Sequence, residues 1–328
     1  MIWTPGVARA ARRIATAAAL GGGGLTALGA TAYALLMAES VVARRVIGRP
    51  HGMEALESDG VYGHFDGPPV VMAMLGDSTA VGLGASEPSR TPGVVLAKGL
   101  ASVSERPVRL AVYGHSGAPS AELGGQVDRL LEEGVPDVAV VFIGANDVTT
   151  QTPPGVAVRH LAKAVRRLRE AGAEVVVGTC PDLGTVRPLA QPLRWVTRRW
   201  SRQLAAAQTV AVVDAGGRTV AFADVLGPEF ATNPGEMFGP DRFHPSDRGY
   251  AQAAYAVLPS VCAALALWPE PRPARGEGLQ PIYLAAATAA EEPGTEVSPT
   301  SVAGQATGPY GRWVTLFRRR LGELLNNA

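Results

Sequence analysis

The sequence is poor in cysteine, in net charge and in clustered metal ligands. Cys180 and Cys262 are its two cysteines, and they lack the paired spacing of a zinc site; we expect two buried thiols, with a disulfide as the alternative if the domain is exported. The formal net charge is +1, and no nucleic-acid-binding motif occurs. Gly82 and Gly84 lack the third glycine of a dinucleotide-binding loop. These absences argue against a metal hydrolase, a dinucleotide-binding domain and a nucleic-acid-binding protein.

The N-terminal region contains an uncharged stretch, residues 14–37, that follows Arg9, Arg12 and Arg13. A helix of ~20 residues spans a bilayer core, so the stretch is long enough to do so. We expect residues 1–40 to be a membrane anchor; a cleaved signal peptide and a soluble alanine-rich helix are the alternatives. Residues 41–67 are expected to be a connector.

From Val70 onward, short apolar runs alternate with amphipathic stretches. The predicted strands are 70–75, 108–113, 137–143, 174–179 and 210–213, and the predicted helices lie near 91–103, 121–133, 155–171, 192–207 and 246–266. This alternation predicts a three-layer α/β/α sandwich with a parallel sheet of roughly five strands, over residues 68–267. Right-handed crossovers place the carboxyl ends of all strands at one edge, where ligands bind in open α/β sheets.

Beyond residue 267 the composition changes. Residues 268–309 are rich in Pro, Ala, Gly, Glu and Thr, and they predict a disordered linker. Residues 310–328 predict a basic amphipathic helix in which Trp313, Phe317 and Leu321 share one face. Such a helix either lies on an anionic membrane surface, over residues 310–325, or docks on the domain.

The stretch 70–84 contains a candidate nucleophile. An apolar run ends in Gly76-Asp77-Ser78, which places Ser78 just past the carboxyl end of a buried strand. Small residues there allow a sharp turn and a close approach of substrate. Taken alone, Ser78 is equally well explained as the N-cap of the next helix, because serine is among the best N-cap residues.

Three later segments carry polar and glycine residues beyond strand ends or just before the last helix: 114–120, 144–147 and 241–244. In this order, and together with residues 76–78, they resemble the four blocks of the SGNH (GDSL-type) hydrolase superfamily. The resemblance covers about residues 68–266. It implies the flavodoxin-like fold of that superfamily and a serine hydrolase activity.

The resemblance implies a role for each matching residue. Ser78 would be the nucleophile, His244 the general base, and Asp241 the group that orients His244. The backbone N–H groups of Ser78 and Gly117 and the side-chain amide of Asn146 would form the oxyanion hole. The residue types suit this chemistry, because a serine hydroxyl needs an adjacent base and histidine titrates near neutral pH. Neutral hydrogen-bond donors stabilise the negative oxygen of a tetrahedral intermediate.

The second block departs from the family pattern, because Val112 or Tyr113 stands where the family often has asparagine. Gly114 therefore competes with Gly117 as an oxyanion donor. Gly117 is preferred, since it follows Ser116 in a family-like Ser-Gly pair. The other polar residues of these blocks are expected to have supporting or surface positions: Asp77, Asp147 and His115.

The predicted function is that of an esterase or lipase-like hydrolase that cleaves short-chain acyl esters through an acyl-enzyme on Ser78, with no cofactor and no metal. One alternative is an acyltransferase or deacetylase that acts on envelope carbohydrate or lipid, because an alcohol can replace water in resolving the same acyl-enzyme. A catalytically silent membrane-associated scaffold is the alternative of another class. Residues 181–200 are the predicted substrate-side wall, and no long apolar lid occurs within 68–266, which favours short acyl chains.

The expected partners are a small-molecule, lipid or glycan acyl ester and, through residues 14–37, a membrane. No nucleic acid partner is expected, and the oligomeric state stays open. We expect the chain at the cell membrane or cell envelope with an extracytoplasmic catalytic domain, or secreted if the N-terminal segment is cleaved.

Overall fold

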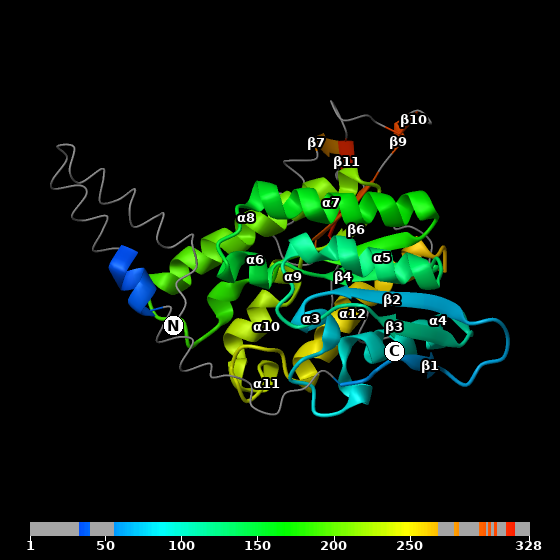
Figure 1. The fold of residues 1–328 in the computed structure, drawn as a ribbon, viewed down its shortest axis with the longest axis horizontal. Coiled ribbons are helices and arrows are strands. Elements are labelled where there is room, and N and C mark those ends of the chain that lie inside the picture. Colours follow the sequence, from blue (N-terminus) through cyan, green and yellow to red (C-terminus); the bar gives the residue numbers. More distant parts are fainter. Residues whose placement is uncertain are drawn as a thin grey trace.

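The computed structural model describes residues 33–39 and 56–267, together with short strand segments nearer the C-terminus (Figure 1). Within these residues the main sheet has six strands in the order β1-β3-β2-β4-β5-β6. Five of the strands are parallel: β2 (Val70–Gly76), β3 (Val108–Val112), β4 (Val138–Phe142), β5 (Glu174–Gly178) and β6 (Arg218–Val220). The number of parallel strands, five, is therefore as predicted.

The strand order reverses at β2, because β3 lies on one side of it and β4 on the other. In open α/β sheets the crevice for a ligand forms at such a switch point, outside the carboxyl ends of the strands. The carboxyl end of β2 carries Gly76, so Ser78 comes directly after this point.

The last parallel strand differs from its prediction. Residues 210–213 belong to α8 (Leu193–Asp214), and the strand is β6, after a turn at Gly216. Helix α8 buries Leu204, Gln208 and Val212 at intervals of four residues. The apolar run is therefore part of the buried face of a helix, and a short run of this kind does not by itself distinguish helix from strand.

The first strand was not predicted. β1 (Gly60–Tyr62) pairs antiparallel with β3 at the edge of the sheet, with Val61 opposite Arg109. Asp59 fixes this edge, because its Oδ1 accepts a hydrogen bond from the Val112 N–H at 2.9 Å. Part of the predicted connector 41–67 thus belongs to the sheet, and the sheet is mixed rather than purely parallel.

Alternate strand residues face helices on opposite sides of the sheet. In β2, Met72 and Met74 belong to one apolar cluster, whereas Ala73 and Leu75 belong to the other. Helices α4 (Pro92–Ser104) and α12 (Asp247–Ala264) pack on the first side. Helices α5 (Leu123–Glu133), α7 (Pro154–Ala171) and the C-terminal part of α8 pack on the second (Figure 1). The predicted α/β/α layers are confirmed.

Several short elements lie in the loops between the main strands and helices. They are α3 (Ser78–Val81), α6 (Ala145–Thr149), α9 (Phe222–Val225), α10 (Gly227–Thr232), α11 (Pro234–Met237) and the 3₁₀ turns η1 (Pro88–Arg90), η2 (Ser120–Glu122) and η3 (Leu183–Thr185). Helices α9 to α11 fill the segment between β6 and α12, for which no element was predicted. Each is too short to show a helical period in its sequence.

The C-terminal segments also differ from their predictions. A three-stranded antiparallel sheet contains β7 (Leu279–Pro281), β11 (Trp313–Arg318) and β8 (Thr295–Pro299), and β9 (Ser301–Val302) pairs with β10 (Gln305–Ala306). The predicted helix 310–328 is wrong over β11, whose β-branched and aromatic residues favour strands. The predicted disordered linker 268–309 is wrong where β7 to β10 lie. The rest of both segments lies outside the described residues.

Most of the predicted anchor 14–37 also lies outside the described residues. Residues 33–39 form a short helix, and the Glu39 Oε2 atom accepts a hydrogen bond at 2.8 Å from the N–H of Leu193, the first residue of α8. Across the described ranges, no helix combines the length and the apolar character that crossing a bilayer requires.

The cysteines match the first of the two expectations. Cys180 follows β5 and Cys262 lies in α12; both are buried thiols rather than halves of a disulfide. Burial raises the pKa of the Cys180 thiol well above its ordinary value.

Candidate active site

The predicted nucleophile, base and acid meet at the carboxyl edge of the sheet. The Nε2 atom of His244 lies 3.1 Å from Ser78 Oγ, and its Nδ1 atom lies 2.6 Å from Asp241 Oδ2. Ser78 follows β2, whereas the other two residues lie in the loop before α12. One imidazole ring thus connects a hydroxyl and a carboxylate from segments far apart in the sequence.

The turn that carries Ser78 is held by its two preceding residues. Gly76 has a φ of 130°, and a Cβ atom there would collide with the carbonyl group of Phe142. Asp77 is the N-cap of α3, since its Oδ1 accepts a hydrogen bond from the Thr79 N–H at 2.9 Å. Ser78 is therefore the first residue of the helix and not its cap, which leaves its hydroxyl available to His244.

The loop of Asp241 and His244 forms around the carboxylate. Asp241 Oδ1 accepts hydrogen bonds at 3.0 Å from the backbone N–H groups of Phe243 and His244, while Oδ2 contacts the imidazole. Arg242 takes a left-handed conformation with a φ of 58°, which closes this tight turn. Burial acts to raise the pKa of Asp241, but the hydrogen bonds from His244 and Phe243 outweigh it and hold the pKa below its ordinary value.

An ionised Asp241 fixes the tautomer of the neutral imidazole. A carboxylate only accepts hydrogen bonds, so the proton of neutral His244 resides on Nδ1. The Nε2 lone pair then points to the Ser78 hydroxyl, which is the arrangement that a general base requires.

The three predicted oxyanion donors belong to one cavity. Ser78, Gly117 and Asn146 all line it. Asn146 donates from Nδ2 to the Ala118 carbonyl oxygen at 3.3 Å, which holds its amide beside the loop of Gly117. Gly117 has a φ of 85°, and a Cβ atom there would meet no atom within 4 Å, so its backbone borders open space.

Gly114, the competing oxyanion donor, has a different position. A Cβ atom on Gly114 would lie 3.1 Å from the Gly76 carbonyl oxygen and 3.2 Å from the Gly76 nitrogen. Gly114 thus allows its loop to pack against the turn of Ser78 and does not line the cavity. This packing favours Gly117 as the donor.

Two buried glutamines, which were not predicted from the sequence, form hydrogen bonds to the backbone at strand ends next to the site. Gln126 of α5 bonds both the N–H and the carbonyl of Gly76, at 2.7 and 2.9 Å. Gln208 of α8 accepts from the Cys180 N–H at 2.7 Å and donates to the Ile143 carbonyl at 3.0 Å. Each amide supplies hydrogen bonds where neighbouring strands separate. The sequence signal was available, because both glutamines lie on the apolar face of an amphipathic helix.

The remaining polar residues of the four blocks have supporting or surface positions, as predicted. Asp147 is fully buried and accepts hydrogen bonds from the N–H and hydroxyl of Ser120, at 3.2 and 2.6 Å. His115 is about half exposed and contacts Glu122 at 2.6 Å. In the described ranges, no group of three or more His, Cys, Asp or Glu residues is placed to hold a metal ion.

Beside the catalytic residues is a cavity of about 280 Å³, which we call the acyl cavity. From the predicted wall 181–200, Pro181 and Leu183 line it, but Trp195 is 59% exposed and Trp200 packs against the core instead. The rest of the apolar lining was not predicted. It comes largely from α9, α10 and the loops after them: Phe222, Leu226, Phe230, Phe238 and Phe243.

Asp77 is a charged group in a fully buried place. Burial raises its pKa from 3.8 to about 6, although hydrogen bonds from Thr79 and the nearby His244 act in the opposite direction. A carboxyl group with a raised pKa keeps its proton longer in the folded state than in the unfolded state. Its contribution to stability is therefore greatest at low pH and is lost as the pH rises from 3.8 towards 6.

We expect Asp77→Asn to stabilise the protein at neutral pH. The amide oxygen can still accept from the Thr79 N–H, and no buried charge remains. At 1.36 kcal/mol for each pKa unit, the gain in the free energy of unfolding is roughly 3 kcal/mol at pH 7.5, and most of it disappears at pH 4.5. Urea unfolding at both pH values measures this difference in the free energy of unfolding. The exposed control Asp66→Asn should show no such difference, and an equal gain for Asp77→Asn at both pH values would contradict the argument.

The chain is similar to a known protein family and to a known protein. The family described as "GDSL-like Lipase/Acylhydrolase family" matches residues 74–252. The chain is 42% identical over 264 residues to "GDSL-like esterase Rv1075c" of Mycobacterium tuberculosis (strain ATCC 25618 / H37Rv), an alignment that covers 77% of this chain and 83% of that protein.

Among solved structures, TesA matches with a TM-score of 0.48 at 22% identity, over 59% of this chain and 99% of that one. Axe2, an acetylxylan esterase from Geobacillus stearothermophilus, matches with a TM-score of 0.45 at 19% identity, over 60% of this chain and 93% of that one.

Proposed function

Because the chain belongs to the GDSL-like lipase/acylhydrolase family and is an ester hydrolase of that family, we propose that it cleaves short-chain carboxylic esters through an acyl-enzyme on Ser78. The observation that carries this proposal is the position of His244, with one ring nitrogen 3.1 Å from the Ser78 hydroxyl and the other 2.6 Å from Asp241. The relative from Mycobacterium tuberculosis, described as a GDSL-like esterase, supports the reaction class.

The first half of the reaction forms the acyl-enzyme. His244 Nε2 takes the proton of Ser78 as Oγ attacks the ester carbonyl carbon, and the carbonyl π electrons move to oxygen. Asp241 stabilises the imidazolium that results. When the tetrahedral intermediate collapses, the C–O bond to the alcohol breaks and His244 Nε2 returns its proton to the leaving oxygen.

The negative oxygen of the intermediate needs donors that are in place before the reaction. The N–H groups of Ser78 and Gly117 and the Asn146 amide supply them at the wall of the acyl cavity. One such donor typically contributes about 10²–10³ in rate. In the second half, His244 deprotonates a water molecule whose oxygen attacks the acyl carbon. The bond between that carbon and Ser78 Oγ then breaks, His244 Nε2 returns the proton to Oγ, and the carboxylic acid is released.

The size of the acyl cavity supports a short acyl group. Its volume of about 280 Å³ lies at the lower edge of the range of roughly 300–1,000 Å³ that is common for ligand pockets. Phe222, Phe230 and Phe238 are among the side chains that line it, and these apolar rings suit an acyl chain rather than a charged group.

Hydrolysis of a p-nitrophenyl ester series by the full chain, without added metal, tests the proposed substrate class. We expect kcat/KM to be highest for acetate or butyrate and at least about tenfold lower for octanoate, because a poorly fitting methylene group costs roughly tenfold or more. Rates that rise steadily with acyl length would contradict a short-chain preference. If an added alcohol is acylated in preference to water, the enzyme is an acyltransferase instead.

A further inference from the structure

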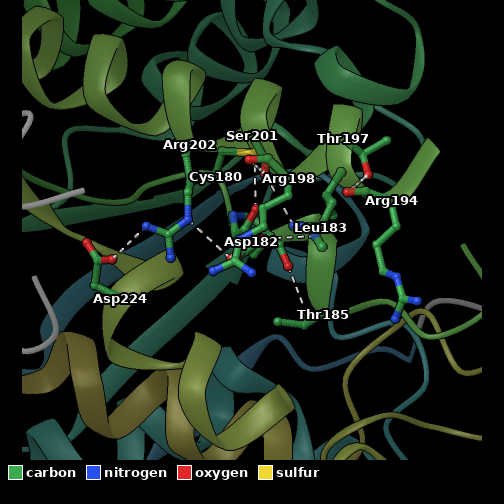
Figure 2. A network of polar contacts seen from close by, with 12 residues as sticks. Cys180, Asp182, Leu183, Thr185, Arg194, Thr197, Arg198, Ser201, Arg202 and Asp224 are labelled. Atoms are coloured by element: carbon green, nitrogen blue, oxygen red, sulfur yellow. Dashed lines mark hydrogen bonds and ion pairs between the residues drawn. The ribbon is translucent and has the colours of Figure 1, made fainter. Parts of the chain in front are cut away.

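Figure 2 shows a charged network around Arg202, Asp182 and Asp224. The network adjoins the acyl cavity, because Asp182 lines that cavity. Arg202 of α8 places its Nε atom 3.3 Å from Asp182 Oδ2 and its Nη1 atom 3.6 Å from Asp224 Oδ1. The Asp182 and Asp224 side chains are only 4% and 1% exposed. Arg198, one turn earlier in α8, also approaches Asp182 Oδ2, at 3.4 Å, but is itself largely exposed. Arg202 therefore joins two buried carboxylates.

Each carboxylate belongs to a segment that forms the acyl cavity. Asp182 is the N-cap of η3, because its Oδ1 accepts from the Gly184 N–H at 2.8 Å, and η3 supplies Leu183 to the cavity. Asp224 lies in α9, between the lining residues Phe222 and Leu226. Arg202 thus connects the wall that follows β5 to the wall that follows β6.

A second cavity, of about 170 Å³, lies beside the first. Asp182, Arg198, Arg202 and Asp224 are among the residues that line this charged cavity. It shares Asp182, Thr185 and Gly227 with the acyl cavity, so at these residues the partition between the two spaces is a single layer. That layer is part of the boundary of the acyl cavity.

The network holds this layer through its charges. A buried carboxylate is costly unless a cation compensates it. Without Arg202, Asp182 would keep, among the described residues, only the exposed Arg198 as a nearby guanidinium. The link from Asp182 to Asp224 would also be lost, so their two segments would be held less firmly together. The guanidinium group suits this position because its planar set of donors can serve two carboxylates at once, whereas a lysine ammonium is a single point of charge.

We propose that Arg202 is a positioning residue that determines specificity: by joining Asp182 to Asp224, it fixes the end of the acyl cavity and limits the length of acyl chain that the enzyme accepts. This inference rests on the proposed function, since it specifies which esters the Ser78 site takes. Arg202 acts through η3 and α9, because Asp182 lines the acyl cavity and Arg202 lines only the charged one.

The test compares wild type with Arg202→Met in the full chain, using p-nitrophenyl acetate, butyrate, octanoate and laurate. We expect the ratio of kcat/KM for octanoate to that for acetate to rise about tenfold in Arg202→Met. The reason is that room for roughly one more methylene group in an apolar pocket changes kcat/KM by about that factor. The change should appear mainly as a lower KM for octanoate. Arg202→Lys keeps the charge without the planar donors, and its ratio should lie between those of wild type and Arg202→Met.

Arg199→Met is the matched control, because Arg199 is an exposed arginine of the same helix. The ratio of kcat/KM for octanoate to that for acetate should be the same in Arg199→Met as in wild type. If Arg202→Met lowers the rates of all esters by one common factor, Arg202 has only a structural role and the inference is overturned. If Arg202→Met does not fold, Arg202→Lys decides, and an unchanged ratio overturns the inference. Wild type that hydrolyses no ester of the series overturns the proposed function, and with it this inference.

Discussion

Ser78→Ala is expected to lower kcat for a p-nitrophenyl ester by about a millionfold, the size of effect found when the nucleophile of a serine hydrolase triad is removed. The reason is that His244 Nε2, now 3.1 Å from Oγ, would have no hydroxyl to deprotonate and no acyl-enzyme could form. The residual rate would come from binding and from the remaining oxyanion donors. Asp77 rather than Ser78 caps α3, so the substitution should leave the turn intact.

The measurement combines steady-state rates with mass spectrometry of the intact protein. Wild type treated with an ester that deacylates slowly should gain the mass of one acyl group, and Ser78→Ala should gain none. Ser102→Ala, an exposed serine of α4, controls for the loss of a hydroxyl and should behave as wild type. Hydrolysis that survives Ser78→Ala at a comparable rate would eliminate the proposed mechanism.

Asp241→Asn is expected to lower kcat by about 10⁴, because it removes the carboxylate that fixes the tautomer of the histidine. An asparagine amide could present its N–H₂ group to Nδ1, which would place the imidazole proton on Nε2. His244 would then donate a hydrogen bond to Ser78 and could not take its proton. The amide oxygen could still accept from the Phe243 N–H, so the loop should keep its shape.

A second variant and thermal unfolding separate this effect from a loss of folding. Asp247→Asn changes a carboxylate that bonds Ser86 at 2.6 Å at the start of α12 and does not line the acyl cavity, so it should retain the wild-type rate. The thermal unfolding of Asp241→Asn should show a folded protein. A loss of less than tenfold in kcat would indicate that Asp241 does not set the tautomer of His244.

The catalytic residues could be predicted because four short blocks occur in one order along an α/β chain. No single block is sufficient, since Ser78 alone is equally well explained as an N-cap. The roles of Ser78, Asp241 and His244 followed from the resemblance of the whole set to the SGNH superfamily. Contacts between segments that are distant in the sequence left a weaker signal in the sequence. The aromatic wall of the acyl cavity depends on how α9 and α10 fold back, and these helices are too short for a period to appear.

The elements that were predicted wrongly share a physical cause, which is that local composition fits more than one structure. The apolar run 210–213 suits a buried strand as well as a buried helix face, and only its packing in α8 decides. Residues 313–318 can place apolar side chains on one face of a helix, yet they pair with β7 and β8 as a strand. The contact between Arg202 and Asp224 could not be predicted either, because the local sequence around each residue does not indicate that the other lies nearby.

The separation of the nucleophile from its base along the chain has a consequence for synthesis. His244 follows Ser78 by 166 residues, and translation at about 5–20 residues per second takes roughly 10–30 seconds to cover that distance. Throughout this interval the nascent chain holds a serine without its activating imidazole, and so it cannot attack the esters of its surroundings. The appearance of esterase activity therefore indicates that the loop of His244 and helix α12 have packed onto the sheet. It can be used to time the completion of folding.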